Sequence, residues 1–263
     1  MNRSSQARTR QTGRGKTPGS SRAKTRRDAP ANTPLAAAVV GGRESAAARA
    51  DRAERICRRL EEHYPDATCS LDFRSPFELV IATILSAQCT DRRVNLVTGP
   101  LFARWPTAAR MAAAPPAALE EVIRSTGFFR AKAKNILGCC QALVDRHGGE
   151  VPRTLADLVK LPGVGRKTAN VVLGSAFGIP SGVVVDTHVG RIARRLGLTR
   201  HADAVRAERD LIACLAEGRW IEFSHRLIAL GRAVCTARKP RCEACPLADL
   251  CPRKGVPRAK RGH

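Results

Sequence analysis

Four cysteines near the C-terminal end of the sequence place the strictest limit on how this chain can fold. They follow the pattern C-x6-C-x2-C-x5-C, at positions Cys235, Cys242, Cys245 and Cys251. Because four thiolates this close in sequence can all reach one metal centre, we expect the segment to fold around a metal. A zinc ribbon usually contains two C-x2-C pairs and this array contains one, yet the spacing alone leaves zinc and an iron–sulfur cluster equally open.

Composition favours an intracellular protein whose cysteines stay reduced. No apolar stretch approaches the roughly 20 residues that cross a bilayer, so we expect no membrane partner. In a reducing compartment the ten cysteines are not expected to form a disulfide framework, which strengthens the metal interpretation. The heavy use of Ala and Arg favours a bacterial cytoplasmic protein, although the Arg- and Ser-rich leader also resembles an organellar transit peptide.

The charge of the chain indicates a polyanionic partner. The formal net charge is +23, and residues 1–34 hold nine basic side chains against one acid, so +15 remains on the rest of the chain. A surplus this large exceeds what solubility requires and attracts nucleic acid. We therefore expect nucleic acid as the first candidate partner, which in a bacterial cell favours an association with the nucleoid.

The sequence divides into a helical body between two basic ends. Residues 1–42 contain almost no large apolar side chains and are predicted to be a disordered basic arm, while residues 254–263 are a basic tail. From Glu44 onward apolar residues recur at helical spacing. Breakers rich in Pro and Gly, at residues 75–76, 115–116, 148–149, 162–163 and 178–180, cut the chain into segments of about 10–20 residues. Only residues 182–186 are expected to be extended. Since one strand makes no sheet, the predicted fold class is all-α.

Residues 161–169, with the sequence LPGVGRKTA, predict a helix–hairpin–helix. Pro162 ends the preceding helix, the two glycines allow backbone conformations that side chains forbid, and an apolar-periodic helix follows from about Arg166. A hairpin of this kind presents backbone N–H groups and the positive end of a helix to a DNA phosphate. The candidate contacts are Gly163, Val164, Gly165 and Arg166.

Two kinds of nucleotide-binding loop resemble this segment and do not fit it. A Walker loop needs Gly where Arg166 stands, and a dinucleotide-binding loop needs Gly or Ala where Thr168 stands. A simple tight turn between core helices stays open as the alternative to the DNA-binding hairpin.

Two candidate catalytic residues follow the hairpin glycines. Lys167 stands in the first turn of the second helix, where the positive helix end and an apolar hairpin favour a nucleophilic amine, although most single lysines lie on the surface. Asp186 precedes a basic helix over residues 189–196 and is expected to cap it, a role that is compatible with catalysis. His188 is expected to pack or orient a neighbour rather than act as a base.

Basic side chains near the cysteines add candidate DNA contacts. Arg238, Lys239 and Arg241 lie between the first two cysteines, so closing the metal site would hold three cations in one surface loop that suits phosphate contact. The alternative is a solvated basic loop. Arg191, on the helix after Asp186, is a further candidate.

Together these motifs resemble the endonuclease III branch of the helix–hairpin–helix DNA glycosylases. The resemblance spans Arg52 to Arg253 and rests on SPFEL at 75–79, LSAQCTD at 85–91, LPGVGRKTA, VDTHV at 185–189 and the cysteine array. It implies a two-lobed, all-helical glycosylase fold. One lobe would be a six-helix barrel over residues 70–185, with the helix–hairpin–helix at 158–177. The other would be a discontinuous domain of residues 44–69 and 186–253 that holds a structural [4Fe–4S] cluster.

The resemblance also implies the function. The chain would be a bifunctional glycosylase and abasic-site lyase of base excision repair, acting as a monomer on double-stranded DNA with oxidised pyrimidines or abasic sites. Lys167 would form a Schiff base with the damaged sugar and nick the strand by β-elimination, and Asp186 would stabilise the developing positive charge. Gln88 would fill the space left by the extruded base, and Phe128, larger than the usual Leu, would wedge into the duplex.

Two other kinds of protein share parts of this pattern. An adenine glycosylase of the same superfamily lacks the hairpin lysine and uses an acid in the helix corresponding to Leu79–Ser86, which has none here, so we exclude it. A noncatalytic, redox-sensing iron–sulfur DNA-binding protein would have no use for Lys167 or Asp186, and it stays the alternative. Val159 stands where some relatives carry a glutamate, so we assign no second acid there.

Overall fold

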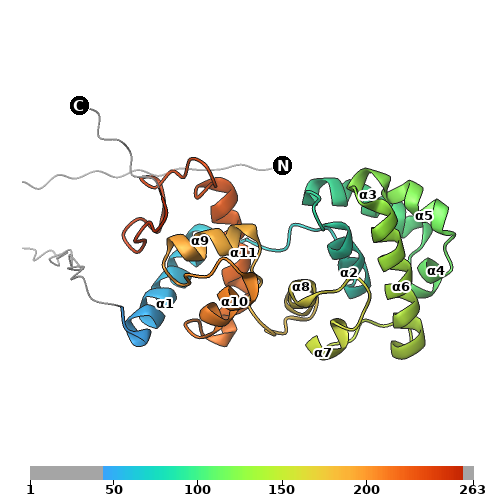
Figure 1. Ribbon diagram of the computed structural model, residues 1–263, viewed down its shortest axis with the longest axis horizontal. Coiled ribbons are helices and arrows are strands. Elements are labelled where there is room, and N and C mark those ends of the chain that lie inside the picture. The colour runs from blue at the N-terminus through green and yellow to red at the C-terminus, as the bar shows by residue number, and fades with distance from the viewer. Residues whose placement is uncertain (1–43, 257–263) are drawn as a thin grey trace, which may run out of the picture. The chain divides into compact units, whose positions relative to one another are not determined.

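The computed structural model describes residues 44–256 (Figure 1). The predicted disordered arm, residues 1–42, and residues 257–263 of the predicted basic tail lie outside the described residues. Residues 44–256 contain helices and no strand, which confirms the all-α prediction, and the segment expected to be extended, residues 182–186, is a loop. The helices and 3-10 turns (η) are α1 (Ala46–His63), α2 (Pro76–Leu85), α3 (Asp91–Arg104), α4 (Ala108–Ala112), α5 (Pro116–Ile123), η1 (Arg124–Thr126), α6 (Phe129–His147), α7 (Leu155–Leu158), α8 (Arg166–Phe177), α9 (Thr187–Arg195), α10 (Ala204–Ile212), η2 (Glu217–Arg219) and α11 (Trp220–Ala233).

Local sequence features set the ends of several helices. Ser75 caps α2 by accepting a backbone N–H bond, and Pro76 occupies the first helical position, where a missing N–H costs nothing. Asp186 caps α9 in the same way as Ser75. Gly148 and Gly178 end α6 and α8 at φ values of 60° and 67°, a left-handed conformation that side chains resist. The Pro and Gly breakers identified in the sequence therefore lie at helix ends.

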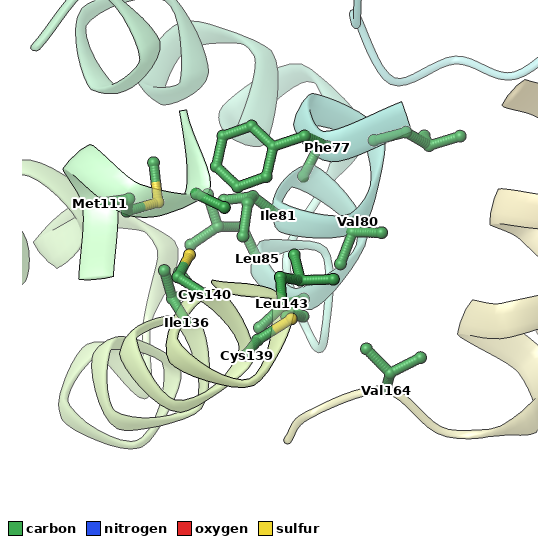
Figure 2. Close-up of a cluster of buried hydrophobic side chains, with 14 of the residues drawn as sticks. Phe77, Val80, Ile81, Leu85, Met111, Ile136, Cys139, Cys140, Leu143 and Val164 are labelled. Atoms are coloured by element: carbon green, nitrogen blue, oxygen red, sulfur yellow. The ribbon is translucent and has the colours of Figure 1, made fainter. Parts of the chain in front are cut away.

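The first hydrophobic core is built around α2, which is buried along residues 77–85. Figure 2 shows Ile81 and Leu85 of α2 gathered with Leu143 and Cys140 of α6 and with Met111 of α4. Burial raises the pKa of the Cys140 thiol, so this cysteine serves as a small apolar side chain. The core extends from α2 to α8.

The second hydrophobic core joins the start of the described chain to its end. Ile56 and Leu60 of α1 pack with residues of α9, α10 and α11 and with Leu247 and Leu250 beyond the last helix. The loop before α9 also belongs here, because Val183 is buried in this core. Two helical cores fit the predicted two-domain fold, whereas the predicted boundaries at residues 69/70 and 185/186 stay predictions. Within residues 44–256 no helix is both long and apolar enough to cross a bilayer.

Candidate active site and metal centre

A groove of about 1310 Å³ is lined by residues of both cores. From the first core come the segment that follows α2 and the start of α8, and from the second come the start of α9 and one residue of α11. Four of the candidate site residues line this groove: Gln88, Lys167, Asp186 and Arg191. Gln88 and Arg191, which are 103 positions apart in the chain, thus face one space.

The hairpin that carries Lys167 requires glycine. Gly163 has a φ of +77°, and a Cβ at this position would lie 2.9 Å from the Cβ of Asn135, so only glycine fits. Val164 is buried in the first core and anchors the turn. Gly165 is the N-cap residue just before α8 and has no side chain to cap it, so the first N–H groups of the helix have no side-chain acceptor. Lys167 follows on the exposed side of the first turn, beside a helix end that attracts anions.

Arg166, the residue before Lys167, is held by an acid from the other core. Its Nε and Nη2 donate to the two carboxylate oxygens of Glu208 on α10, at 2.8 and 3.1 Å. Asn170, also on α8, donates to the same carboxylate at 2.9 Å. Glu208 raises the pKa of the Arg166 guanidinium. Glu208 was not among the residues predicted from the sequence. Its place beside the apolar positions Ala207 and Leu211 is the signal that could have shown that this acid is buried and needs a hydrogen-bond donor.

Asp186 has the capping role that its sequence position predicts. Its Oδ1 accepts the backbone N–H of Val189 at 2.8 Å, and the residue is half-buried at the rim of the groove. His188, two residues on, lies 3.2 Å from Nη2 of Arg191 through its Nδ1. A Cβ at Gly231 of α11 would come within 2.7 Å of the same ring nitrogen, so His188 is packed tightly against α11.

Arg191 is used mainly inside the protein. Its Nη2 donates to the carbonyl oxygens of Cys235 and Gly231, at 3.0 and 3.4 Å. Burial lowers the pKa of the Arg191 guanidinium. The residue lines the groove and at the same time ties α9 to the start of the cysteine segment, so its predicted contact with DNA stays a prediction.

Gln88 and Phe128 share an unusual backbone conformation. Their φ values are 52° and 47°, in the left-handed region that residues with side chains rarely adopt. Gln88 lies at the groove, in the turn between α2 and α3. Phe128 is 66% exposed at the start of α6 and does not line the groove. Strained exposed residues such as these are found at ligand-binding positions.

The four cysteines of the C-terminal array line one cavity, together with Leu196, Leu230 and Leu247. Burial raises the pKa of the Cys245 and Cys251 thiols. Within residues 44–256 no three His, Cys, Asp or Glu side chains lie close enough together to hold a single metal ion. Four sulfur donors around an apolar cavity fit the chemistry of an iron–sulfur cluster.

Arg195 supports the cysteine segment and was not identified from the sequence. This arginine is buried, and its Nη1 donates to the Sγ of Cys235 at 3.2 Å and to the carbonyl of Thr236 at 2.7 Å. Its Nη2 donates to the carbonyl of Ala237 at 2.8 Å. The sequence around α9 does not show that Arg191 and Arg195 turn inward. Their acceptors are mostly backbone carbonyls about 40 residues away, and a carbonyl leaves no mark in the sequence.

The predicted basic loop between the first two cysteines is on the surface. Arg238, Lys239 and Arg241 are all exposed. The loop is closed by two hydrogen bonds, from Thr236 Oγ1 to the carbonyl of Lys239 at 2.8 Å and from the Arg241 N–H to the carbonyl of Val234 at 3.0 Å. The three cations therefore lie on one ordered loop outside the groove.

Comparisons with known proteins agree with this geometry. Residues 81–214 match the HhH-GPD superfamily of base excision DNA repair proteins, and residues 235–251 match the iron–sulfur binding domain of endonuclease III. Endonuclease III of Synechocystis sp. is 55% identical over 206 residues, which cover 78% of this chain and 94% of that protein. Endonuclease III of Bacillus subtilis is 47% identical over 205 residues, which cover 78% and 93%.

Solved structures give the same result. A non-covalent endonuclease III–DNA complex and a trapped endonuclease III–DNA covalent intermediate each show 45% identity and a TM-score of 0.73. Both cover 78% of this chain, and 95% and 96% of their own chains. The match to the iron–sulfur domain decides between the two metals left open by the cysteine spacing and confirms the [4Fe–4S] prediction. The chain belongs to the endonuclease III family of the HhH-GPD superfamily of base excision DNA repair proteins.

Proposed function

We propose that Lys167 and Asp186 carry out the reaction of this enzyme, a glycosylase and abasic-site lyase that acts on damaged double-stranded DNA. The observation that carries the assignment is that an exposed amine from one core and a carboxylate from the other face the same groove. The relative trapped as a covalent DNA intermediate supports a nucleophile in the protein, and a lysine amine is the nucleophile that forms Schiff bases with sugars.

In the proposed reaction the neutral amine of Lys167 attacks C1′ of the damaged deoxyribose. The bond from C1′ to the base breaks, and the base leaves with the bonding electron pair. Loss of a proton from nitrogen and opening of the sugar ring give a Schiff base, and removal of a C2′ proton then expels the 3′ phosphate by β-elimination. Asp186 has two roles in this reaction. Its negative charge stabilises the positive sugar, and its carboxylate accepts a proton from the attacking amine.

The surrounding residues are proposed to hold DNA in an open form. The N–H groups of Gly163 and Gly165 bind a phosphate at the start of α8, while the N–H of Val164 between them donates to the carbonyl of Leu161 at 3.0 Å and holds the turn. Arg166 is oriented beside them by Glu208. Gln88 occupies the space of the extruded nucleotide and Phe128 inserts between neighbouring bases, which its 66% exposure permits. Further phosphate contacts come from Arg191, Arg238, Lys239 and Arg241.

We assign the four array cysteines as ligands of the [4Fe–4S] cluster. The bound cluster supplies a rigid cross-link of four chain positions rather than electrons for base removal. Arg195 holds Cys235 by its sulfur and by the next carbonyls, so the first ligand and the basic loop are positioned together. This connection makes the cluster a support for the DNA-binding surface.

We propose oxidised or ring-saturated pyrimidines and abasic sites as the lesions. We propose that the enzyme works as a monomer on the nucleoid of a bacterial cytoplasm. The bacterial relatives support the bacterial setting, and the net charge of +23 supports the association with the nucleoid. A surplus of positive charge of this size favours stable association with DNA rather than with a membrane.

The test is borohydride trapping on a duplex with one thymine glycol, in the wild type, Lys167→Ala and the control Lys160→Ala. Lys160 is an exposed lysine just before the hairpin that pairs with Asp157. We expect a covalent adduct in the wild type and the control and none in Lys167→Ala. Equal cluster absorbance in all three proteins verifies folding. An adduct that persists in Lys167→Ala contradicts the assigned nucleophile, and no wild-type adduct on thymine glycol or an abasic site favours the noncatalytic redox sensor.

A further inference from the structure

The two residues proposed to enter the DNA, Gln88 and Phe128, need support that their own segments do not provide. Both are in left-handed conformations that are strained for residues with side chains. Neither is a glycine, and each lies in a short connection between helices, Gln88 after α2 and Phe128 between η1 and α6. Strain of this kind persists only where surrounding contacts fix the backbone.

One buried lysine contacts both connections. Lys132 of α6 is 4% exposed, and its Nζ donates to the carbonyl oxygen of Leu85 and to that of Thr126, each at 2.8 Å. Leu85 is the last residue of α2, three positions before Gln88. Thr126 is the last residue of η1, two positions before Phe128. A single amine therefore joins the two backbone segments from which the strained residues project.

Burying this amine is costly, and the structure offers no simpler reason for it. Burial lowers the pKa of the Lys132 amine, which reflects the cost of placing a cation away from water. The carbonyls at a helix end have no partner within the helix, and a cation beside them also gains from the helix dipole of α2. An apolar side chain would fill the same volume but would leave both carbonyls buried without a donor.

Neighbouring contacts hold the second segment from the outside. Arg124 comes before Phe128 in the chain and Arg130 comes after it. The guanidinium group of each lies 5.4 Å from the ring centre of Phe129. In the first turn of α6, Lys132 also donates its backbone N–H to the carbonyl of Phe128 at 3.0 Å. The wedge is thus fixed at its base while its ring stays exposed.

We infer that Lys132 is a positioning residue that fixes the Gln88 and Phe128 segments relative to each other before DNA binds. The inference rests on the proposed function of these two residues as the groups that replace and flank the extruded nucleotide. Extrusion of a nucleotide requires free energy to break its base pair and its stacking. Gln88 and Phe128 offset this free energy only if both insert into the duplex together. Ordering them in the folded protein removes an ordering cost from the binding step.

A positioning role has a distinctive effect on substrates. Loss of Lys132 should harm the excision of a base that is paired and stacked, because this base needs both inserting groups to stay out of the helix. A lesion that is already unpaired costs less to extrude, so its excision should be affected less. Simple loss of stability would instead reduce the activity on both DNAs by the same factor.

The experiment compares Lys132→Met with the control Lys134→Met, which replaces an exposed lysine one half-turn along the same helix. Single-turnover excision is measured on thymine glycol paired with adenine and on the same lesion in a single-nucleotide bulge. In Lys132→Met we expect the ratio of the paired to the bulged rate to fall by about tenfold or more, the effect of a lost charged hydrogen bond in a buried site. The control should keep the wild-type ratio.

Other outcomes overturn the inference in identifiable ways. An unchanged ratio in a folded, cluster-loaded Lys132→Met protein shows that the lysine does not position the inserting groups. If Lys132→Met does not fold, Lys132→Gln is measured instead. Its amide nitrogen is one bond nearer the backbone than Nζ and does not reach both carbonyls, so the inference again expects the ratio to fall, and an unchanged ratio overturns it. A wild type that is inactive on both DNAs contradicts the proposed function instead, so the two failures are distinct.

Discussion

The substitution Glu208→Ala tests how the two cores are held together beside Lys167. The Glu208 side chain is 7% exposed and accepts hydrogen bonds from Arg166 and Asn170, both on α8. The network continues through Ser181, whose Oγ donates to the Asn170 side chain at 2.9 Å. Removing the carboxylate therefore breaks contacts between a helix of the first core and a helix of the second.

The magnitude follows from the exposure of each partner. The Arg166 side chain is 45% exposed and can return to water, so its ion pair contributes at most about 1 kcal/mol after screening. Asn170 is 3% exposed, and its amide left without an acceptor costs about 1–3 kcal/mol. Relief of the buried charge offsets part of this sum. We expect a net loss of about 2 kcal/mol, equivalent to about 4–8 °C in Tm for a chain of this size.

Thermal unfolding of the cluster-loaded proteins measures the effect, followed both by circular dichroism and by cluster absorbance. Glu217→Ala removes an exposed acid of η2 and is the matched control. Glu208→Gln keeps an oxygen acceptor for Asn170 and should recover about half of the loss. A Tm of Glu208→Ala within about 1 °C of the control would show that the buried Glu208 network does not stabilise the fold. Equal losses in Glu208→Gln and Glu208→Ala would show that the charge pair with Arg166, and not the buried amide, carries the stabilisation.

Two further predictions concern a carboxylate and a histidine. Asp186→Asn keeps a side chain that caps α9 as well as Asp does, so we expect a Tm within about 2 °C of wild type and a borohydride-trapping rate lower by about 100-fold or more. A full trapping rate in this variant would make Asp186 a cap only. Burial lowers the pKa of His225 from its ordinary 6.5, so the unfolded chain binds the proton more readily. The stability from the neutral ring is present above pH 6.5 and is lost as the pH falls toward the lower, folded-state pKa, with a slope of at most about 1.4 kcal/mol per pH unit. Urea unfolding of His225→Gln should show a flatter dependence below pH 6.5, and an unchanged slope would contradict it.

Features that depend on neighbouring residues could be predicted from the sequence. The hairpin glycines, the cap at Asp186 and the helix ends at Gly148 and Gly178 depend on local backbone conformation, which residue type largely determines. The cysteine array was visible because its ligands are close in sequence. Apart from the array, which spans 17 residues, each of these predictions needed only residues within about one or two turns of one another.

The contacts that the sequence did not reveal join distant segments through backbone groups or single acids. Lys132 meets the carbonyl of Leu85 across 47 positions, and Arg166 meets Glu208 across 42. A carbonyl is present at every residue, so no pattern of side chains identifies it as the partner of a buried lysine. Charged residues in a chain this basic are expected on the surface, and the few that turn inward are distinguished only by the packing around them.

The second core has a consequence for the order in which a newly made chain can assemble. Ile56 and Leu60 of α1 leave the ribosome early, whereas their partners Phe223 and Leu247 are among the last to be made. Residues 71–173 supply the whole first core and can close it in the meantime. The apolar side of α1 therefore stays uncovered until α9, α10 and α11 have been made. Synthesis that stops before Cys235 leaves this core without Leu247 and Leu250 and the cluster without its four ligands, so maturation of the cluster coincides with completion of the fold.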